Sequence, residues 1–201
     1  MQPKLRAAIV SLVCLFVWPL PASAQRASTG PFGLRRGLTK VEAEKFAGPL
    51  TQEQPGIYKT ARVPQPSPDF ESYGLVITPA LGLCAILADG RTLQIDSRGT
   101  QIQSAFGSLK HALALKYGDP SRVDDFLRPG SKIDKPEEWA LGLVREERIL
   151  SAAWKLKSNP AGLSVIRLDA SGLSSSKAYL RLMFGFDNGD ACADELKKMR
   201  R

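Results

Sequence analysis

Few residues of the kinds that carry enzyme chemistry occur in this chain, and none stands in a catalytic motif. His111 is the single histidine, so a multi-histidine metal site and the H-E-x-x-H zinc motif are both excluded. A Ser-His-Asp triad would have to use His111, yet the G-x-S-x-G turn that presents a nucleophilic serine is missing. The glycines are dispersed turn residues that form no phosphate-binding loop. We therefore predict no catalytic, cofactor-binding or metal-binding residue.

Neighbouring carboxylates do not form acid–base pairs. Asp124 and Asp125 follow each other on a predicted strand, so their side chains point to opposite faces of the sheet. Glu146 and Glu147 are adjacent in the same way and give the same negative result. A glycosidase could still use distant carboxylates that folding brings together. An enzyme with such a non-motif carboxylate site therefore stays open as an alternative.

Three aspartates near the C-terminus faintly suggest oxygen ligands for calcium. Asp187, Asp190 and Asp194 lie around Asn188-Gly189, but their spacing is not that of an EF-hand loop. A helix cap explains Asp190 more simply, because an aspartate accepts hydrogen bonds from free N–H groups at a helix start. We expect Asp190 to begin a terminal helix.

The N-terminus has the pattern of a secretory signal. Lys4 and Arg6 precede an apolar run at 7–18, and Ala22-Ser23-Ala24 is a small-residue cleavage site. We expect a signal peptide at 1–24, cleavage near Ala24, and a periplasmic or secreted mature protein. The apolar run is shorter than the about 20 residues that a membrane-spanning helix needs.

Cysteine usage agrees with export. Cys14 follows Val13 instead of the small residue that a lipoprotein signal requires, so we expect no lipid anchor and no stable membrane attachment. Cys84 and Cys192 are the remaining two, and an even count in an oxidising compartment favours a disulfide bond between them. The alternative is two buried thiols, and no C-x-x-C suggests redox catalysis.

The charge balance points away from nucleic acid. The chain has 28 basic and 20 acidic residues and a formal net charge of +8. Acidic residues are interspersed among the basic ones, so no basic stripe or aromatic stacking motif results. We expect no nucleic acid as a partner. Because we expect the chain to be exported, we expect its partner to be a protein of the cell envelope.

The periodicities predict an α+β fold in which antiparallel meanders are packed by a few helices. The clearest helix covers 100–117, where Ile102, Phe106 and Leu113 recur at helical spacing. Thr100 and Gln103 fit a capping box at its start. A second capping box at Thr39 and Glu42 opens a shorter helix, and further helices are expected at 136–143 and 190–200. Strands are expected at 56–63, 70–78, 83–88, 92–95, 122–127, 148–157, 163–169 and 178–187.

The domain prediction follows from these elements. A flexible mature N-terminus at 25–33 precedes a single α+β domain at 34–201. Both 46–49 and 117–120 end a capped helix with an aromatic residue, a glycine and a proline, and a strand follows each. This similarity favours two repeated helix-plus-sheet halves at 34–96 and 97–201.

Aromatic residues outside the strongest core patterns are candidates for a partner surface. We single out Tyr73 and Trp139, the latter within an acidic short helix. An exposed cluster of such side chains would indicate a binding site.

The segment 37–48, GLTKVEAEKFAG, resembles the G-[ML]-[TS]-x-x-E helix opening of small bacterial envelope domains. These include the small lipoprotein of the outer-membrane β-barrel assembly machine and the β-lactamase-inhibitor-protein fold. The resemblance implies an α+β module that binds other proteins and is not a catalyst. The segments FESYGLVITPALGLCAI and DAC also resemble uncharacterised exported proteobacterial proteins, which implies localisation alone.

These observations favour a soluble exported, non-enzymatic module that binds an envelope protein through its sheet or an aromatic loop. The first alternative is an inhibitor of a hydrolase, which requires a protruding loop such as 63–70 or 126–135. The second is the enzyme with a non-motif carboxylate site.

Overall fold

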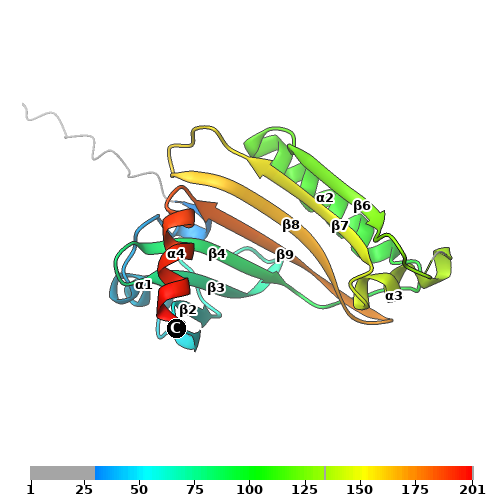
Figure 1. The fold of residues 1–201 in the computed structure, drawn as a ribbon, viewed down its shortest axis with the longest axis horizontal. Coiled ribbons are helices and arrows are strands. Elements are labelled where there is room, and N and C mark those ends of the chain that lie inside the picture. Colours follow the sequence, from blue (N-terminus) through cyan, green and yellow to red (C-terminus); the bar gives the residue numbers. More distant parts are fainter. Residues whose placement is uncertain (1–29, 134, 201) are drawn as a thin grey trace, which may run out of the picture.

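The computed structural model describes residues 30–133 and 135–200, and within them the fold is α+β (Figure 1). In this described part of the chain, four α-helices pack on one nine-stranded sheet in which each pair of neighbours is antiparallel. This confirms the predicted fold class. The predicted signal peptide at 1–24 lies outside the described residues.

The helical elements are η1 (Pro31–Gly33), α1 (Lys40–Ala47), α2 (Thr100–Tyr117), η2 (Pro136–Glu138), α3 (Trp139–Val144) and α4 (Gly189–Met199). The strands are β1 (Thr51–Gln54), β2 (Ile57–Thr60), β3 (Phe70–Thr78), β4 (Gly82–Gly90), β5 (Leu93–Gln94), β6 (Arg122–Leu127), β7 (Arg148–Lys155), β8 (Leu163–Ser174) and β9 (Lys177–Phe186). Their order across the sheet is β1-β2-β3-β4-β9-β8-β7-β6.

The pairing of β4 with β9 joins an N-terminal and a C-terminal group of strands into one sheet. Ile86 stands opposite Phe184 and Ala88 opposite Leu182 in this central pair. All four side chains are buried. Each group consists of a helix followed by four strands, α1 with β1–β4 and α2 with β6–β9. This common order is what a duplication would produce, and duplication of the halves 34–96 and 97–201 stays a proposal.

Two strand predictions need correction. The short strand β5, which we expected to extend the 70–88 hairpin, pairs with β9 instead: Leu93 lies opposite Ala178. The strand β4 includes Asp89 and Gly90: Asp89 pairs with Arg181 of β9, and Gly90 pairs with Phe70 of β3. The strand β1 was missed, since its sequence TQEQ is wholly polar and every residue in it is exposed.

The helix α2 packs on one face of the sheet, hereafter the covered face. Ile102, Phe106 and Leu113 are buried there, as the predicted apolar stripe requires, and the tilted ring of Tyr117 packs against Phe184 with centroids 6.2 Å apart. The helix contacts β8 and β9. Gly107 in the middle of α2 faces open space, because no other atom lies within 4 Å of a Cβ added there.

The N-terminal segment closes the same face. Phe32 lies edge-on to Tyr73, with ring centroids 4.9 Å apart, and to Phe184 at 5.8 Å. Pro31 is buried. Residues 30–33 therefore belong to the packed core and not to the flexible terminus that we predicted for 25–33.

The start of α2 differs from the predicted capping box. The N-cap residue is Gly99, which has a left-handed φ of 67° and no side chain. Asp96 takes over the role predicted for the Gln103 side chain, because its Oδ1 accepts a hydrogen bond of 2.8 Å from the Thr100 N–H. The Asp96 N–H in turn donates to Gln101 Oε1 at 2.8 Å. At α1 the predicted box is confirmed: Thr39 and Glu42 satisfy each other's backbone N–H groups.

The C-terminal end of α3 places a non-glycine residue in the left-handed region. Glu146 has φ 56°, and its N–H donates to Leu143 O while the Glu147 N–H donates to Gly142 O. These two bonds make a Schellman motif, and the position that Glu146 occupies in this motif is usually a glycine. A Cβ at this position strains the backbone.

Replacing Asp96 with Asn is expected to lower the free energy of unfolding near pH 6 and to have less effect at acidic pH. Hydrogen bonds from Thr100, first through its backbone N–H, lower the pKa of Asp96 below the ordinary value of an aspartate. The stabilisation is therefore present above that value and is lost as the pH falls through the lower, folded-state pKa. Urea titrations of both proteins between pH 6 and pH 2.5 measure it; a difference independent of pH would contradict the assignment.

Replacing Glu146 with Gly is expected to raise the free energy of unfolding by about 0.5–1 kcal/mol, because glycine adopts the left-handed conformation without a Cβ clash. The matched control is Arg145→Gly, since Arg145 has an ordinary φ of −84° and glycine there gains nothing. Urea titration of the three proteins measures the difference. Equal destabilisation by both glycines would contradict the strain at Glu146.

Candidate functional site

The face of the sheet opposite α2 carries an apolar band that solvent still reaches, hereafter the open face. Its members are half-buried and lie on the central strands: Val76, Ala85, Leu87, Val165 and Met183. Leu87 stands opposite Met183, and Ala85 opposite Gly185. Figure 1 looks onto this face, where α4 lies over one end and β8 and β9 are uncovered.

A row of charged residues borders the apolar band. The register places Asp89, Arg181, Asp169, Ser151 and Asp124 opposite one another across β4, β9, β8, β7 and β6. Arg181 Nε donates to Asp89 Oδ1 at 2.6 Å, and Arg167 Nε donates to both Asp169 oxygens at 2.8 Å. The hydrogen bond with Asp89 raises the pKa of Arg181. Charges of both signs thus lie in fixed positions beside an apolar surface.

A cavity of about 420 Å³ opens where α4 meets the open face. Its apolar walls come from both elements: Val76, Ala85, Val165, Met183, Ala193 and Leu196. Asp187 and Asp190 stand among its lining residues. The Leu196 side chain of α4 also packs against the β1–β2 turn, where a Cβ on Gly56 would overlap it.

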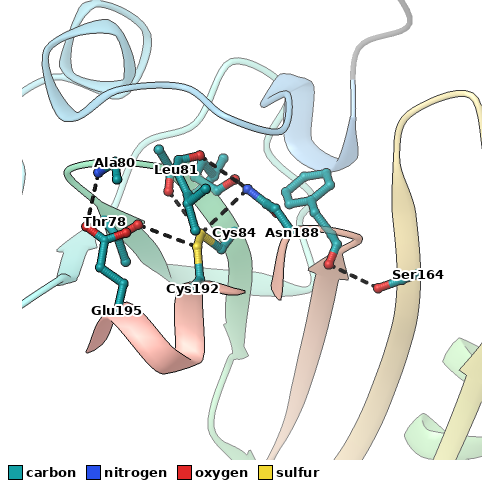
Figure 2. The surroundings of a disulfide bond; sticks show 11 residues. Thr78, Ala80, Leu81, Cys84, Ser164, Asn188, Cys192 and Glu195 are labelled. Carbon is teal, nitrogen blue, oxygen red and sulfur yellow. Dashed lines mark hydrogen bonds between the residues drawn. A yellow bond between two sulfur atoms is a disulfide. The ribbon is translucent and has the colours of Figure 1, made fainter. Parts of the chain in front are cut away.

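The disulfide bond between Cys84 and Cys192 attaches α4 to β4, as we predicted (Figure 2). The two Cα atoms are 6.4 Å apart, and 108 positions separate the residues in sequence. Cys84 occupies a register shift, because Ala85 pairs with Val76 and Leu83 with Ile77. Such a bulge redirects a side chain. Cys84 thereby lines the same cavity as Ala85, on the side of α4.

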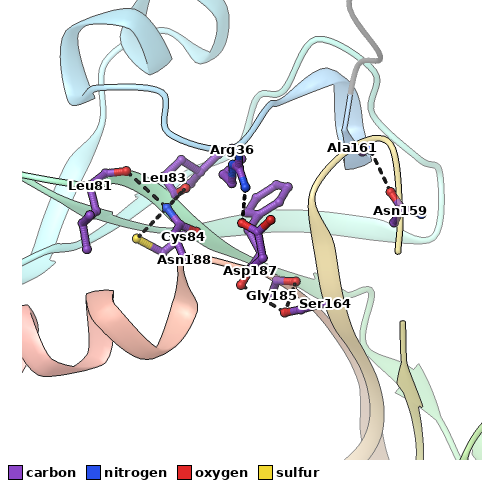
Figure 3. Close-up of polar contacts among 11 residues, drawn as sticks. Arg36, Leu81, Leu83, Cys84, Asn159, Ala161, Ser164, Gly185, Asp187 and Asn188 are labelled. Carbon is purple, nitrogen blue, oxygen red and sulfur yellow. Dashed lines mark hydrogen bonds and ion pairs between the residues drawn. The ribbon is translucent and has the colours of Figure 1, made fainter. Parts of the chain in front are cut away.

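Polar contacts around the disulfide fix the start of α4 (Figure 3). Asn188 Nδ2 donates to Leu81 O at 3.2 Å and to Leu83 O at 3.3 Å. The Glu195 carboxylate accepts from the Ala80 N–H at 3.0 Å. Asp187, just before the helix, forms an ion pair with Arg36 from the N-terminal segment. Asp190 makes no capping bond, so our prediction that it begins the helix as its cap is wrong.

Two buried acceptors lie unused at this junction. Asn188 Oδ1 and Glu195 Oε2 are buried and have no hydrogen-bond partner among the described residues. Each side chain already holds the 80–83 turn through its other polar atom. These contacts position α4 as a wall of the cavity.

Tyr73 does not belong to an accessible surface. It is only 1% exposed, it packs against Phe32, and its hydroxyl accepts a 3.3 Å hydrogen bond from the Ser67 N–H. This bond, together with those from Arg91 Nε to Pro68 O and from the Gln65 N–H to Phe32 O, ties the 63–70 loop to the core. That loop therefore does not protrude freely, as an inhibitor would require.

Trp139 is also buried, at 8% exposure, so our partner surface of Tyr73 and Trp139 is wrong. Its ring fills the space beside Gly99, where a Cβ would overlap it, and the Arg148 guanidinium lies 5.4 Å from the ring centroid. We expected Trp139 to be exposed because acidic residues precede it. Instead, the indole packs against Gly99, the N-cap residue of α2.

The carboxylates and the histidine lie where the sequence suggested. Asp124 contacts Arg122 at 2.7 Å, and Asp125 contacts Arg148 at 2.9 Å. His111 is exposed on α2. Within residues 30–133 and 135–200, no three histidine, cysteine or carboxylate side chains gather as they would around a metal ion.

The residues of the open face were missed as a site. Alternation along β9 carries Met183 and Arg181 to the face opposite Phe184, but Ala85 and Val165 on the same face come from β4 and β8. The surface could have been predicted from sequence only if the pairing of β4 with β9 had been known.

No family model, curated protein or solved structure matches this chain. In the described part of the chain, no helix has the length and apolar character needed to cross a membrane.

Removing the disulfide with Cys84→Ala and Cys192→Ala together is expected to lower the free energy of unfolding by about 2–4 kcal/mol, because the closed loop is long. Denaturant titration measures the loss, and dithiothreitol should bring the unaltered protein close to the double variant. If reductant leaves its stability unchanged, the disulfide contributes nothing to the fold.

Proposed function

We propose that this chain is an exported protein-binding module and that the open face, together with the cavity beside α4, is its docking surface. The observation that carries the proposal is the apolar band of Val76, Ala85, Leu87, Val165 and Met183, which lies half-buried on a sheet face that no helix fully covers. A sheet face of this kind gains free energy when a partner removes it from water.

The surface has the composition of a protein interface. Its centre is apolar, and its border is a row of charges held in ion pairs, which matches the apolar core and polar rim of stable complexes. Charges of both signs in fixed positions favour a partner whose charges are complementary and disfavour others. The cavity beside α4 would take one protruding apolar side chain of the partner.

The positions of the carboxylates give the enzymatic alternative less support than the open face gives to a docking surface. The carboxylates nearest the open face, Asp89, Asp169 and Asp124, are each engaged by an arginine. A general acid or base needs to be free to exchange a proton with a substrate. A docking surface requires no such freedom.

A photo-cross-linking residue placed at Leu87 in the exported protein is expected to give a discrete cross-linked product in cells. The same residue at Leu115, which is 77% exposed on α2 across the sheet, is the matched control and should give none. Met183→Glu, opposite Leu87, should abolish the product because it places a charge at the centre of the apolar band.

Circular dichroism and thermal unfolding of the purified variant must first show that Met183→Glu retains its fold. Loss of the cross-link in a folded variant supports the open face as the docking surface. Cross-linking that is equal from positions 87 and 115, or that survives Met183→Glu, contradicts it.

A further inference from the structure

The outer edge of β6 is an unpaired strand edge at the far end of the sheet from β1. The strand has six residues and pairs only with β7 in the described part of the chain. Figure 1 shows it as the last strand of the sheet. Val123 is 46% exposed and Phe126 is 41% exposed. Exposed apolar residues on an unpaired strand edge favour pairing with another chain.

The register identifies which backbone groups face outward. The N–H of Arg128, directly after β6, donates to the O of Glu147, directly before β7. The hydrogen-bonded pairs of the ladder are therefore Arg128 with Glu147, Phe126 with Ile149, and Asp124 with Ser151. Antiparallel ladders alternate, so every second residue bonds to the neighbour and the others point away. The free N–H and C=O groups therefore belong to Val123, Asp125 and Leu127.

The side chains along this edge have a distinct order. On the open-face side they run basic, acidic and apolar at Arg122, Asp124 and Phe126, since these oppose Ala153, Ser151 and Ile149. On the covered-face side the order is apolar, acidic and apolar at Val123, Asp125 and Leu127. A matching antiparallel strand reads, from its N-terminus, two apolar residues, two basic residues, one apolar residue and one acidic residue.

A second copy of this chain does not match that order. If two β6 edges paired about a twofold axis, the registers that overlap most residues would place Asp124 or Asp125 opposite its own copy. Like charges directly opposite each other destabilise a strand pair. The two aspartates therefore disfavour pairing of this edge with a second copy of itself. Charged residues on edge strands prevent self-association in many natural sheets.

We propose that the outer edge of β6 binds an extended segment of another protein by strand addition, with basic side chains opposite Asp124 and Asp125 and apolar side chains beside Val123 and Phe126. This site uses the backbone edge of β6 and not the apolar band, although Asp124 also stands in the row that borders that band. Arg122 and Arg148, which pair with Asp124 and Asp125 in the free protein, would share these carboxylates with the basic side chains of the added strand. Main-chain bonds to Val123, Asp125 and Leu127 would supply affinity, and the side-chain order would supply selectivity.

The test uses two fluorescent peptides, TLVKKVET and its charge-reversed counterpart TLVEEVKT, with the unaltered protein. The first is expected to bind more tightly, even though the net charge of +8 on the chain would by itself favour the second. Equal binding, preference for the second peptide, or no binding of either up to about 1 mM overturns the proposal.

Amide exchange measured by NMR locates the contact. In the free protein the amides of Asp124 and Phe126 should exchange slowly and those of Val123, Asp125 and Leu127 quickly. Saturation with TLVKKVET should slow the second set by about tenfold or more. Binding that leaves these three amides unprotected overturns the proposal.

Val123→Pro removes an outward N–H and no bond to β7, and proline is tolerated at such an edge position. It should weaken peptide binding by about fivefold or more, whereas Val123→Ala, which keeps the N–H, should lose less. Thermal unfolding of both variants checks the fold. A dimer of the unaltered protein that Val123→Pro dissociates would show self-pairing and contradict the proposal.

Discussion

The hydrogen-bonded pairing of β4 with β9 is the interaction on which the rest of this structure depends. It joins strands that are far apart in sequence and turns two four-stranded groups into one continuous sheet. Alternation along both strands then sends Ile86, Ala88, Leu182 and Phe184 to the covered face, where α2 and Phe32 bury them. The core is therefore built around this pair.

The same alternation creates the open face. Ala85, Leu87, Arg181 and Met183 are carried to the other side of the sheet by the period of two. The bulge at Cys84 is the local exception, because it sends the sulfur toward α4 and attaches that helix by the disulfide. One wall of the cavity thus depends on a covalent bond, and the floor depends on the central pair.

Local features were predictable from sequence and distant ones were not. The Thr39–Glu42 box is confirmed because both partners lie within one turn, while the box at Thr100 is wrong because Asp96, outside the helix, reaches the same N–H. The pairing of Cys84 with Cys192, predicted from an even cysteine count and an expected oxidising compartment, is confirmed. Tyr73 and Trp139 were misplaced because their burial is decided by Phe32 and Gly99, which come from other segments. Their sequence neighbours carry no signal of this.

Residue-resolved hydrogen exchange in increasing denaturant tests the central pair most directly. If β4 and β9 join the two groups of strands into one cooperative unit, the amides of β3, β4, β8 and β9 should exchange through a single opening with one free energy and one denaturant dependence. If the amides of β3 and β4 lose protection at a lower denaturant concentration than those of β8 and β9, the two groups open independently, and the pairing does not unify the fold.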